Sequence, residues 1–348
     1  MIEKKDLDGP VELLSMQETT DDFATIFEPS CFDDYLGQHE VKNKIKVFVT
    51  ASKMRGDPLD HMLLFGPPGL GKTTLAKIMA KELNVPFRIT SAPILERTGD
   101  LVAILSSITA REILFIDEIH RLPKNVEEIL YSAMENFCVD VIIGQGAGAK
   151  SIRLPLQPFT LIGATTKTSL ISGPLQTRFG IVERLDFYQP EDLAHIVMQN
   201  ADFMGIPCLP EAALTIGQRA RGTPRIVKRI IRRVRDFAQV HNYNIIDTTV
   251  VNQALTFLGI DEDGLNKLDR AILTHILQDF DGGPVGLDTL AAMTGEDKES
   301  IEDVCEPFLL RIGLLQKSPR GRQIPAKKIP YLRRKLLGQI TPEQSELF

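Results

Sequence analysis

The sequence has no tryptophan, few aromatic residues and only four cysteines among its 348 residues. Cys31, Cys138, Cys208 and Cys305 lie far apart without a Cys-x-x-Cys pair, and the six histidines form no His-x-x-x-His pattern. Neither a disulfide framework nor a zinc site is therefore indicated, and we expect buried, reduced thiols. No uninterrupted apolar run is long enough to span a bilayer, so we expect a cytoplasmic protein.

The chain is too long for one ordinary hydrophobic core, and its patterns predict several domains. We expect loose tails at 1–22 and 341–348. Between them we expect an α/β domain with a parallel sheet over 23–186, a small all-helical domain over 187–260, and a winged-helix domain over 261–340.

The net charge of −6 argues against a polyanionic partner only if it is averaged over the whole chain. From Arg311 to Ile340 there are nine Lys or Arg residues and no Asp or Glu, and a second basic cluster spans Arg219–Arg235. Residues 1–34 are rich in acidic side chains. This asymmetry favours contact with phosphate at the far end of the chain.

A glycine-rich stretch, Gly66–Thr74, follows the apolar run Met62–Phe65 and precedes a helical pattern. Glycines let backbone N–H groups approach an anion, and the helix that follows directs its positive end at it. In this pattern a lysine reaches the β- and γ-phosphates and the next hydroxyl holds Mg²⁺. The expected nucleotide contacts are Gly69, Leu70, Gly71, Lys72, Thr73 and Thr74, with Thr73 also a Mg²⁺ ligand.

A fully apolar strand is predicted at Glu112–Glu118, with two carboxylates at its carboxyl end. Open α/β sheets bind ligands at that edge. We expect Asp117 to bind water on the Mg²⁺, and Glu118 to act as the base that activates the attacking water. Alone, such a pair would be a solvated strand end, but its place after Lys72 and a buried strand disfavours that alternative.

Other patterns complete the α/β domain. Pro86–Thr90 is predicted as a buried strand, Leu101–Thr109 as a helix, and Phe159–Thr166 as a strand whose last residue, Thr166, could contact the attacking water or the γ-phosphate. Arg178 follows at the domain edge, too far from its own phosphates but within reach of those of a neighbouring subunit; alone it would be a surface residue.

Tyr35 and Leu36 precede a helical pattern that ends near Arg55, with Val41, Ile45, Val47 and Phe48 as its apolar positions, and they should lie near the base. Residues 139–156 predict a β-hairpin too apolar to stand alone, which either packs on the core or serves as a docking surface.

Four helices are expected after Pro190: Glu191–Met204, Glu211–Arg219, Pro224–Val240 and one near Thr248–Leu258. Thr223 suits an N-cap and Pro224 the first helical position. Arg225 is then a cation at the positive end of a helix, so an anion should face it: a bound γ-phosphate or a nearby carboxylate.

The last region predicts helices at Leu265–Gln278, Leu287–Met293 and Lys298–Leu310, followed by a strand, a turn and a strand. The third helix carries Glu299, Glu302, Asp303 and Glu306, which would repel DNA. We therefore expect sequence-independent backbone contacts through the wing residues Lys317, Arg320 and Arg322, and through Lys298.

Together these residues resemble the AAA+ ATPases. Gly66–Thr74 is similar to their Walker A motif, Ile113–Glu118 to Walker B, Thr166 to sensor 1, Arg178 to the arginine finger and Arg225 to sensor 2. The resemblance narrows to the RuvB family of Holliday-junction branch-migration motors through Asp33–Gln38, Asp60–Thr74, Asp117–Leu122, Arg219–Ile226 and Gly282–Leu287, and it covers about residues 25–335.

The resemblance implies an AAA+ parallel-sheet domain, a helical lid and a winged helix that form a homo-hexameric ring around duplex DNA. It implies ATP and Mg²⁺ between subunits, with Arg178 acting on the neighbour's nucleotide and Tyr188 contacting its own. It also implies that the hairpin near 139–156 docks the junction-binding partner RuvA, with RuvC as the resolvase.

Three positions depart from the family pattern. Glu28-Pro29 stands where Arg-Pro is usual, so an arginine contact with the nucleotide is lost or replaced. Gln176 stands where an additional arginine is common, which leaves Arg178 as the finger. Lys317 replaces a wing arginine and keeps the charge without the bidentate fork.

Two other functions remain open. The Asp117–His120 stretch suggests a DEAH-type helicase, but such enzymes carry a second RecA-like domain, whereas the residues after 187 are helical here. A scaffold that uses ATP only as an assembly ligand is the non-enzymatic alternative. The presence of Glu118, Thr166 and Arg178 in one chain favours hydrolysis.

Overall fold

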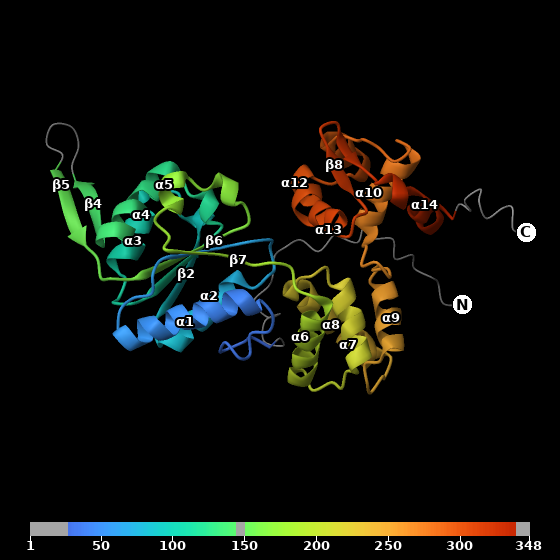
Figure 1. Cartoon of the computed structure of the whole chain (residues 1–348), viewed down its shortest axis with the longest axis horizontal. Coiled ribbons are helices and arrows are strands. Elements are labelled where there is room, and N and C mark those ends of the chain that lie inside the picture. The colour runs from blue at the N-terminus through green and yellow to red at the C-terminus, as the bar shows by residue number, and fades with distance from the viewer. Residues whose placement is uncertain (1–26, 144–149, 339–348) are drawn as a thin grey trace, which may run out of the picture.

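The computed structural model describes residues 27–143 and 150–338. In Figure 1 a sheet domain lies on the left, four helices lie at the lower right, and the winged helix lies above them. The tails predicted at 1–22 and 341–348 lie outside the described residues.

The sheet domain is built on five parallel strands. They are β1 (Met62–Phe65), β2 (Phe87–Ser91), β3 (Ile113–Asp117), β6 (Thr160–Thr165) and β7 (Ile181–Arg184), in the order β2-β3-β6-β1-β7. Every neighbouring pair is parallel, so all carboxyl ends meet at one edge. That edge carries Phe65, Asp117 and Thr165, the last residues of three adjacent strands.

The prediction of β2 as a buried strand is wrong. β2 is one of the two edge strands of this sheet and pairs only with β3 among the described strands. Its Ile89 side chain is 54 % exposed. An apolar run alone does not reveal whether a second neighbour and a helix cover it.

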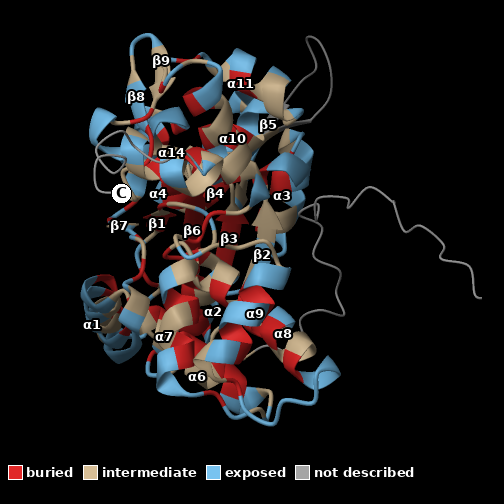
Figure 2. Ribbon diagram, turned by 90° about the vertical axis from the view of Figure 1, so that its right-hand side faces the viewer, coloured by how far each residue is buried: buried red, intermediate tan, exposed pale blue. Residues whose placement is uncertain are grey.

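Helices cover both faces of the sheet, and its three central strands, β1, β3 and β6, are buried (Figure 2). They are α1 (His39–Arg55), α2 (Lys72–Leu83), α3 (Thr98–Ser106), α4 (Lys124–Asn136) and the short α5 (Gly173–Gln176). In α1, Val49 is buried whereas Val47, predicted as apolar, is 64 % exposed. α3 begins earlier than predicted because the Asp100 carboxylate accepts the Arg97 N–H at 2.9 Å and caps the helix.

The predicted hairpin is present. β4 (Cys138–Ile143) pairs antiparallel with β5 (Lys150–Pro155), while the predicted turn over 144–149 lies outside the described residues. At its base Val139 is buried in the cluster beneath α4, whereas Ile152 is 44 % exposed. The hairpin extends from the sheet domain on the side away from the winged helix (Figure 1).

The lid consists of α6 (Pro190–Phe203), α7 (Pro210–Arg219), α8 (Pro224–Val240) and α9 (Thr248–Phe257). Its apolar residues join those of α1, α2 and the sheet in one continuous cluster. Thr223 occupies the predicted N-cap position but makes no side-chain capping bond; its hydroxyl donates to the Ala220 carbonyl at 3.4 Å.

The winged-helix domain has its own apolar cluster. Its elements are α10 (Lys267–Gln278), α11 (Leu287–Thr294), α12 (Lys298–Ser300), α13 (Glu306–Arg311), β8 (Gln316–Ser318), β9 (Gly321–Gln323) and α14 (Ile329–Leu337). The helix predicted over Lys298–Leu310 contains a π-helical segment, Ile301–Cys305. Pro307 follows that segment, and a proline inside a helix lacks an N–H and clashes with the carbonyl four residues earlier.

Within residues 27–143 and 150–338, no helix combines the length and the apolar character required to cross a membrane.

Candidate functional site

The glycine-rich loop connects β1 to α2 at the carboxyl edge of the sheet. Gly69 has φ +78°, and a Cβ there would lie 2.9 Å from the Arg225 Cβ. Gly71 is the N-cap of α2, has φ +92° and provides no side-chain capping bond. The first N–H groups of α2 therefore face the loop without a side-chain partner from the cap, which is the arrangement that binds phosphate.

Lys72 points back into this loop. Its Nζ donates to the carbonyls of Gly66 at 2.8 Å and Pro67 at 3.0 Å, and the residue is buried. Burial lowers the pKa of Lys72, while Asp117 and Glu118 oppose that shift. The ammonium group thus lies between the phosphate loop and the two carboxylates at the end of β3.

Asp117 ends β3, and its Oδ1 accepts the Glu118 N–H at 2.9 Å. Glu118 has φ +50°, and its Oε2 lies 3.4 Å from His120 Nε2. No group of three or more His, Cys, Asp or Glu in the described part of the chain could hold a metal. Asp117 and the Thr73 hydroxyl nevertheless fit Mg²⁺, which takes one or two protein ligands and completes its shell with phosphate and water.

Two tyrosines close on the loop from different parts of the chain. The hydroxyl oxygens of Tyr35 and Tyr188 each lie 3.3 Å from the Leu70 carbonyl oxygen and 3.2 Å from each other. Burial raises the pKa of Tyr188 to about 12 and also raises that of Tyr35. Leu36 packs against the same apolar cluster. The segment before α1 and the join to the lid therefore meet at the loop.

Arg225, at the start of α8, lies against the phosphate loop. Its backbone N–H donates to the Gly69 carbonyl at 3.3 Å. The lid thus brings this arginine to the loop across more than 150 residues of sequence. Glu28, where the family usually has arginine, lies 3.6 Å from Lys77 Nζ on α2.

Thr166 directly follows β6, the strand next to β3, so it lies at the same edge as Glu118. Arg178 lies elsewhere. Its guanidinium donates to the Pro174 carbonyl at 2.6 Å, pairs with Glu135 at 3.1 Å and lies 4.3 Å above the Tyr131 ring. Its described partners belong to α4 and α5 rather than to the phosphate loop, in keeping with the prediction that Arg178 does not serve its own nucleotide.

Three of the four predicted DNA contacts carry carboxylate partners. Lys317 Nζ lies 2.6 Å from Glu306, and Arg322 Nε lies 2.6 Å from the same carboxylate. Lys298 pairs with Asp288. Arg320 is exposed and makes no ion pair with any described residue. Glu302 and Glu306, two of the helix carboxylates expected to repel DNA, thus neutralise the wing residues Lys317 and Arg322.

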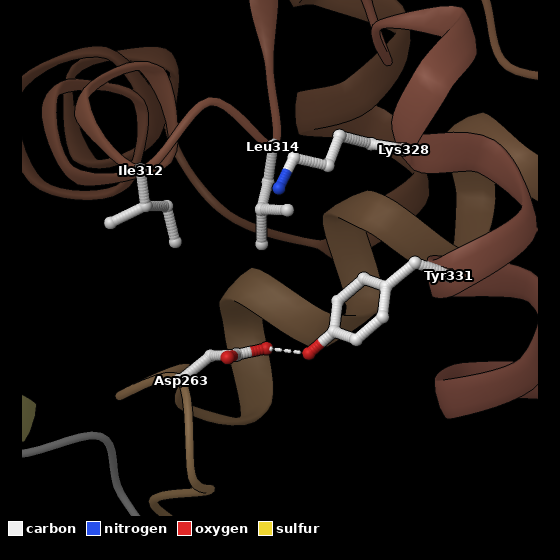
Figure 3. A pocket seen from close by; sticks show the side chains of 5 residues that line it. All are labelled: Asp263, Ile312, Leu314, Lys328 and Tyr331. Atoms are coloured by element: carbon white, nitrogen blue, oxygen red, sulfur yellow. Dashed lines mark hydrogen bonds between the residues drawn. The ribbon is translucent and has the colours of Figure 1, made fainter.

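Two of the cavities in the described part of the chain lie in different domains. One, of about 170 Å³, lies within the winged-helix domain, where the Tyr331 hydroxyl donates to Asp263 and Lys328 also lines the cavity (Figure 3). The other, of about 250 Å³, lies at the join to the lid and is lined by Tyr188, Gly222 and Arg311, among others. Only the second lies near the predicted site residues.

Sequence reasoning missed two residues near the site. His120 is almost fully buried beside Glu118, and its Nδ1 lies 2.9 Å from Thr165 Oγ1. Lys167, next to Thr166, pairs with Asp303 of the winged helix at 2.9 Å. The stretch from Asp117 to His120 was a visible signal for the first, whereas nothing local marked the second.

Three family models match the chain: the Holliday junction DNA helicase RuvB P-loop domain over residues 27–185, the RuvB AAA lid domain over 188–261 and the RuvB C-terminal winged helix domain over 262–333. The solved Thermotoga maritima RuvB Holliday junction branch migration motor is 45% identical and covers 90% of this chain and 99% of its own, with a TM-score of 0.79. A proline-to-glycine mutant of T. maritima RuvB is 44% identical, with coverages of 91% and 100% and a TM-score of 0.81. The chain therefore belongs to the RuvB family of AAA+ P-loop ATPases.

Proposed function

We propose that this protein is an ATP-driven DNA motor that drives Holliday-junction branch migration. The observation that carries the proposal is the meeting of Lys72, Asp117 and Glu118 at one edge of a parallel sheet, beside a loop whose helix N-terminus faces them. This is the constellation that phosphoryl transfer to water requires: a phosphate cradle, a cation and a base.

In this account the loop N–H groups and Lys72 bind the phosphates of ATP. Asp117 and Thr73 are the residues suited to Mg²⁺, which when bound would neutralise charge on the phosphate oxygens. Glu118 accepts a proton from the attacking water, and Thr166 orients that water or the γ-phosphate. Arg225 approaches the loop from the lid, and Tyr35, Leu36 and Tyr188 form its other wall. A bound nucleotide would therefore contact both the sheet domain and the lid, and its binding should change how the two domains are joined.

Arg178 completes the site of an adjoining copy in a homo-hexameric ring. Its contacts with α4 and α5, rather than with its own phosphate loop, support this proposal. An arginine supplied in this way neutralises charge that develops in the transition state and contributes about 10³- to 10⁵-fold in related enzymes.

Duplex DNA is the proposed substrate of the motion. Arg320 and the paired cations Lys298, Lys317 and Arg322 would contact phosphates without selecting sequence. The hairpin near 139–156, in which Ile152 is exposed, is the proposed docking site for RuvA, and RuvC would resolve the migrated junction.

The experiment is a steady-state ATPase assay of Glu118→Gln, with and without duplex DNA. We expect turnover to fall at least about 100-fold while nucleotide affinity stays unchanged, because general-base contributions are of this order. Glu128→Gln, an exposed glutamate on α4, is the matched control and should retain full turnover. Undiminished hydrolysis by Glu118→Gln would exclude Glu118 as the base.

The same assay distinguishes the motor from an ATP-assembled scaffold. A scaffold would bind ATP and assemble, but its turnover would be negligible and insensitive to DNA.

A further inference from the structure

His120 lies between the proposed base and the end of the neighbouring strand. Its side chain is 6 % exposed, with Nε2 3.4 Å from Glu118 Oε2 and Nδ1 2.9 Å from Thr165 Oγ1. Thr165 is fully buried, and its Oγ1 also accepts the Lys167 N–H at 3.0 Å. A single buried ring therefore connects the carboxyl ends of β3 and β6.

The position of the proton on the His120 ring follows from its two contacts, the close approach of the Glu118 carboxylate and the hydrogen bond with Thr165. An ionised carboxylate only accepts, so the contact with Glu118 requires the proton on His120 Nε2. A neutral imidazole then accepts at Nδ1, and Thr165, which already accepts from the Lys167 backbone, has its own hydroxyl proton to donate. Burial lowers the pKa of His120, although the Glu118 carboxylate acts in the opposite direction. The lowered pKa favours the neutral ring. Hydrogen bonds thus run from the Lys167 N–H to Thr165 and from Thr165 to His120, whose Nε2 faces the Glu118 carboxylate at 3.4 Å.

We propose that His120 is a positioning residue: held by the Thr165 hydroxyl, it fixes the Glu118 carboxylate relative to the strand end that carries Thr166. The two groups proposed to act on the attacking water, Glu118 and Thr166, are thereby held in one frame. The left-handed backbone of Glu118 brings its side chain off the strand direction, so a lateral contact is needed to restrict it. This inference rests on the proposed role of Glu118.

The test compares kcat, KM and nucleotide affinity of the full chain for His120→Leu, Thr165→Val and Thr165→Ser. We expect His120→Leu and Thr165→Val to lower kcat by about 10- to 100-fold, because a misplaced catalytic group costs this much, while KM and affinity stay unchanged. Thr165→Ser keeps the hydroxyl and should turn over near the wild-type rate. Since both residues act through one contact, the double variant His120→Leu/Thr165→Val should be no slower than His120→Leu alone.

The outcomes separate this inference from the proposed function. If Glu118→Gln is inactive but His120→Leu and Thr165→Val turn over normally, His120 does not position the base and the motor account is unaffected. If Glu118→Gln also turns over normally, the assignment of the base itself fails. Equal losses in Thr165→Ser and Thr165→Val would exclude the hydroxyl as the holding group. Should His120→Leu fail to fold, the nearly isosteric Thr165→Val decides the question.

Discussion

Two of the contacts between the winged-helix domain and the rest of the chain differ in burial. Toward the lid, the Arg221 guanidinium pairs with the carboxylate of Asp269, which is fully buried. Arg221 also donates to the Gly264 carbonyl at 3.1 Å, and its guanidinium lies 4.6 Å above the Phe308 ring. Toward the sheet domain, the Lys167–Asp303 ion pair has both side chains more than 40 % exposed.

The difference indicates which parts move together. A buried pair resists separation because parting it leaves a charge without solvent or partner, whereas an exposed pair exchanges readily for water. The winged helix should therefore follow the lid as one body and contact the sheet domain only lightly. Motion of the lid at the nucleotide site would then carry the winged helix, and any DNA bound to it.

The largest effect is expected from breaking the buried contact. Arg221→Met keeps most of the side-chain volume but leaves Asp269 buried and unpaired, so the free energy of unfolding should fall by about 3–5 kcal/mol. Urea unfolding followed by circular dichroism measures this loss. Removing the stranded charge as well, in Arg221→Met/Asp269→Asn, should recover part of the loss. A loss below about 1 kcal/mol, within the range of surface ion pairs, would mean that this joint is no stronger than the exposed one.

An intermediate effect is expected from Arg311, which lies 4.3 Å above the Phe187 ring at the join to the lid and 5.7 Å from the Phe308 ring. Arg311 is exposed, so Arg311→Leu should reduce the free energy of unfolding by about 0.5–1 kcal/mol through the lost cation–π contact. Arg311→Lys, which keeps a cation, should lose less. Equal losses in the two variants would show that charge over the ring is unimportant.

The smallest effect is expected from the exposed contact. Lys167→Met should change the free energy of unfolding by no more than about 0.5 kcal/mol, and high salt should remove the difference from wild type. Lys53→Met, at an exposed α1 lysine without a described ion pair, is the control. A loss comparable with that of Arg221→Met would invalidate the contrast between the two contacts.

Much of the nucleotide site could be predicted from sequence because its signals are local. A strand, a glycine turn and a lysine at the start of a helix specify the loop around Lys72 within a dozen residues. A buried apolar run ending in Asp117 and Glu118 specifies β3 in the same way. Parallel pairing of β1 and β3 through β6 then brings both to one edge.

Most features that could not be predicted from the sequence depend on tertiary contacts. One depends on the effect of a single proline within a long helical pattern. The wing cations pair with Glu306, whose position relative to β8 and β9 only the folded domain defines. The edge position of β2 depends on the order of strands rather than on its own residues. Pro307 was visible in the sequence, but the regular spacing of apolar residues around it predicted an uninterrupted α-helix rather than the π-helical segment that precedes it.

The most direct test of the motor account mixes two inactive chains, Arg178→Ala and Glu118→Gln, and measures ATP turnover. At an interface where the Arg178→Ala chain supplies Glu118 and the Glu118→Gln chain supplies Arg178, the site is complete. The account predicts that the mixture hydrolyses ATP well above either chain alone, with a maximum near equal proportions. A mixture that co-assembles and binds nucleotide yet stays as inactive as its parts would contradict it.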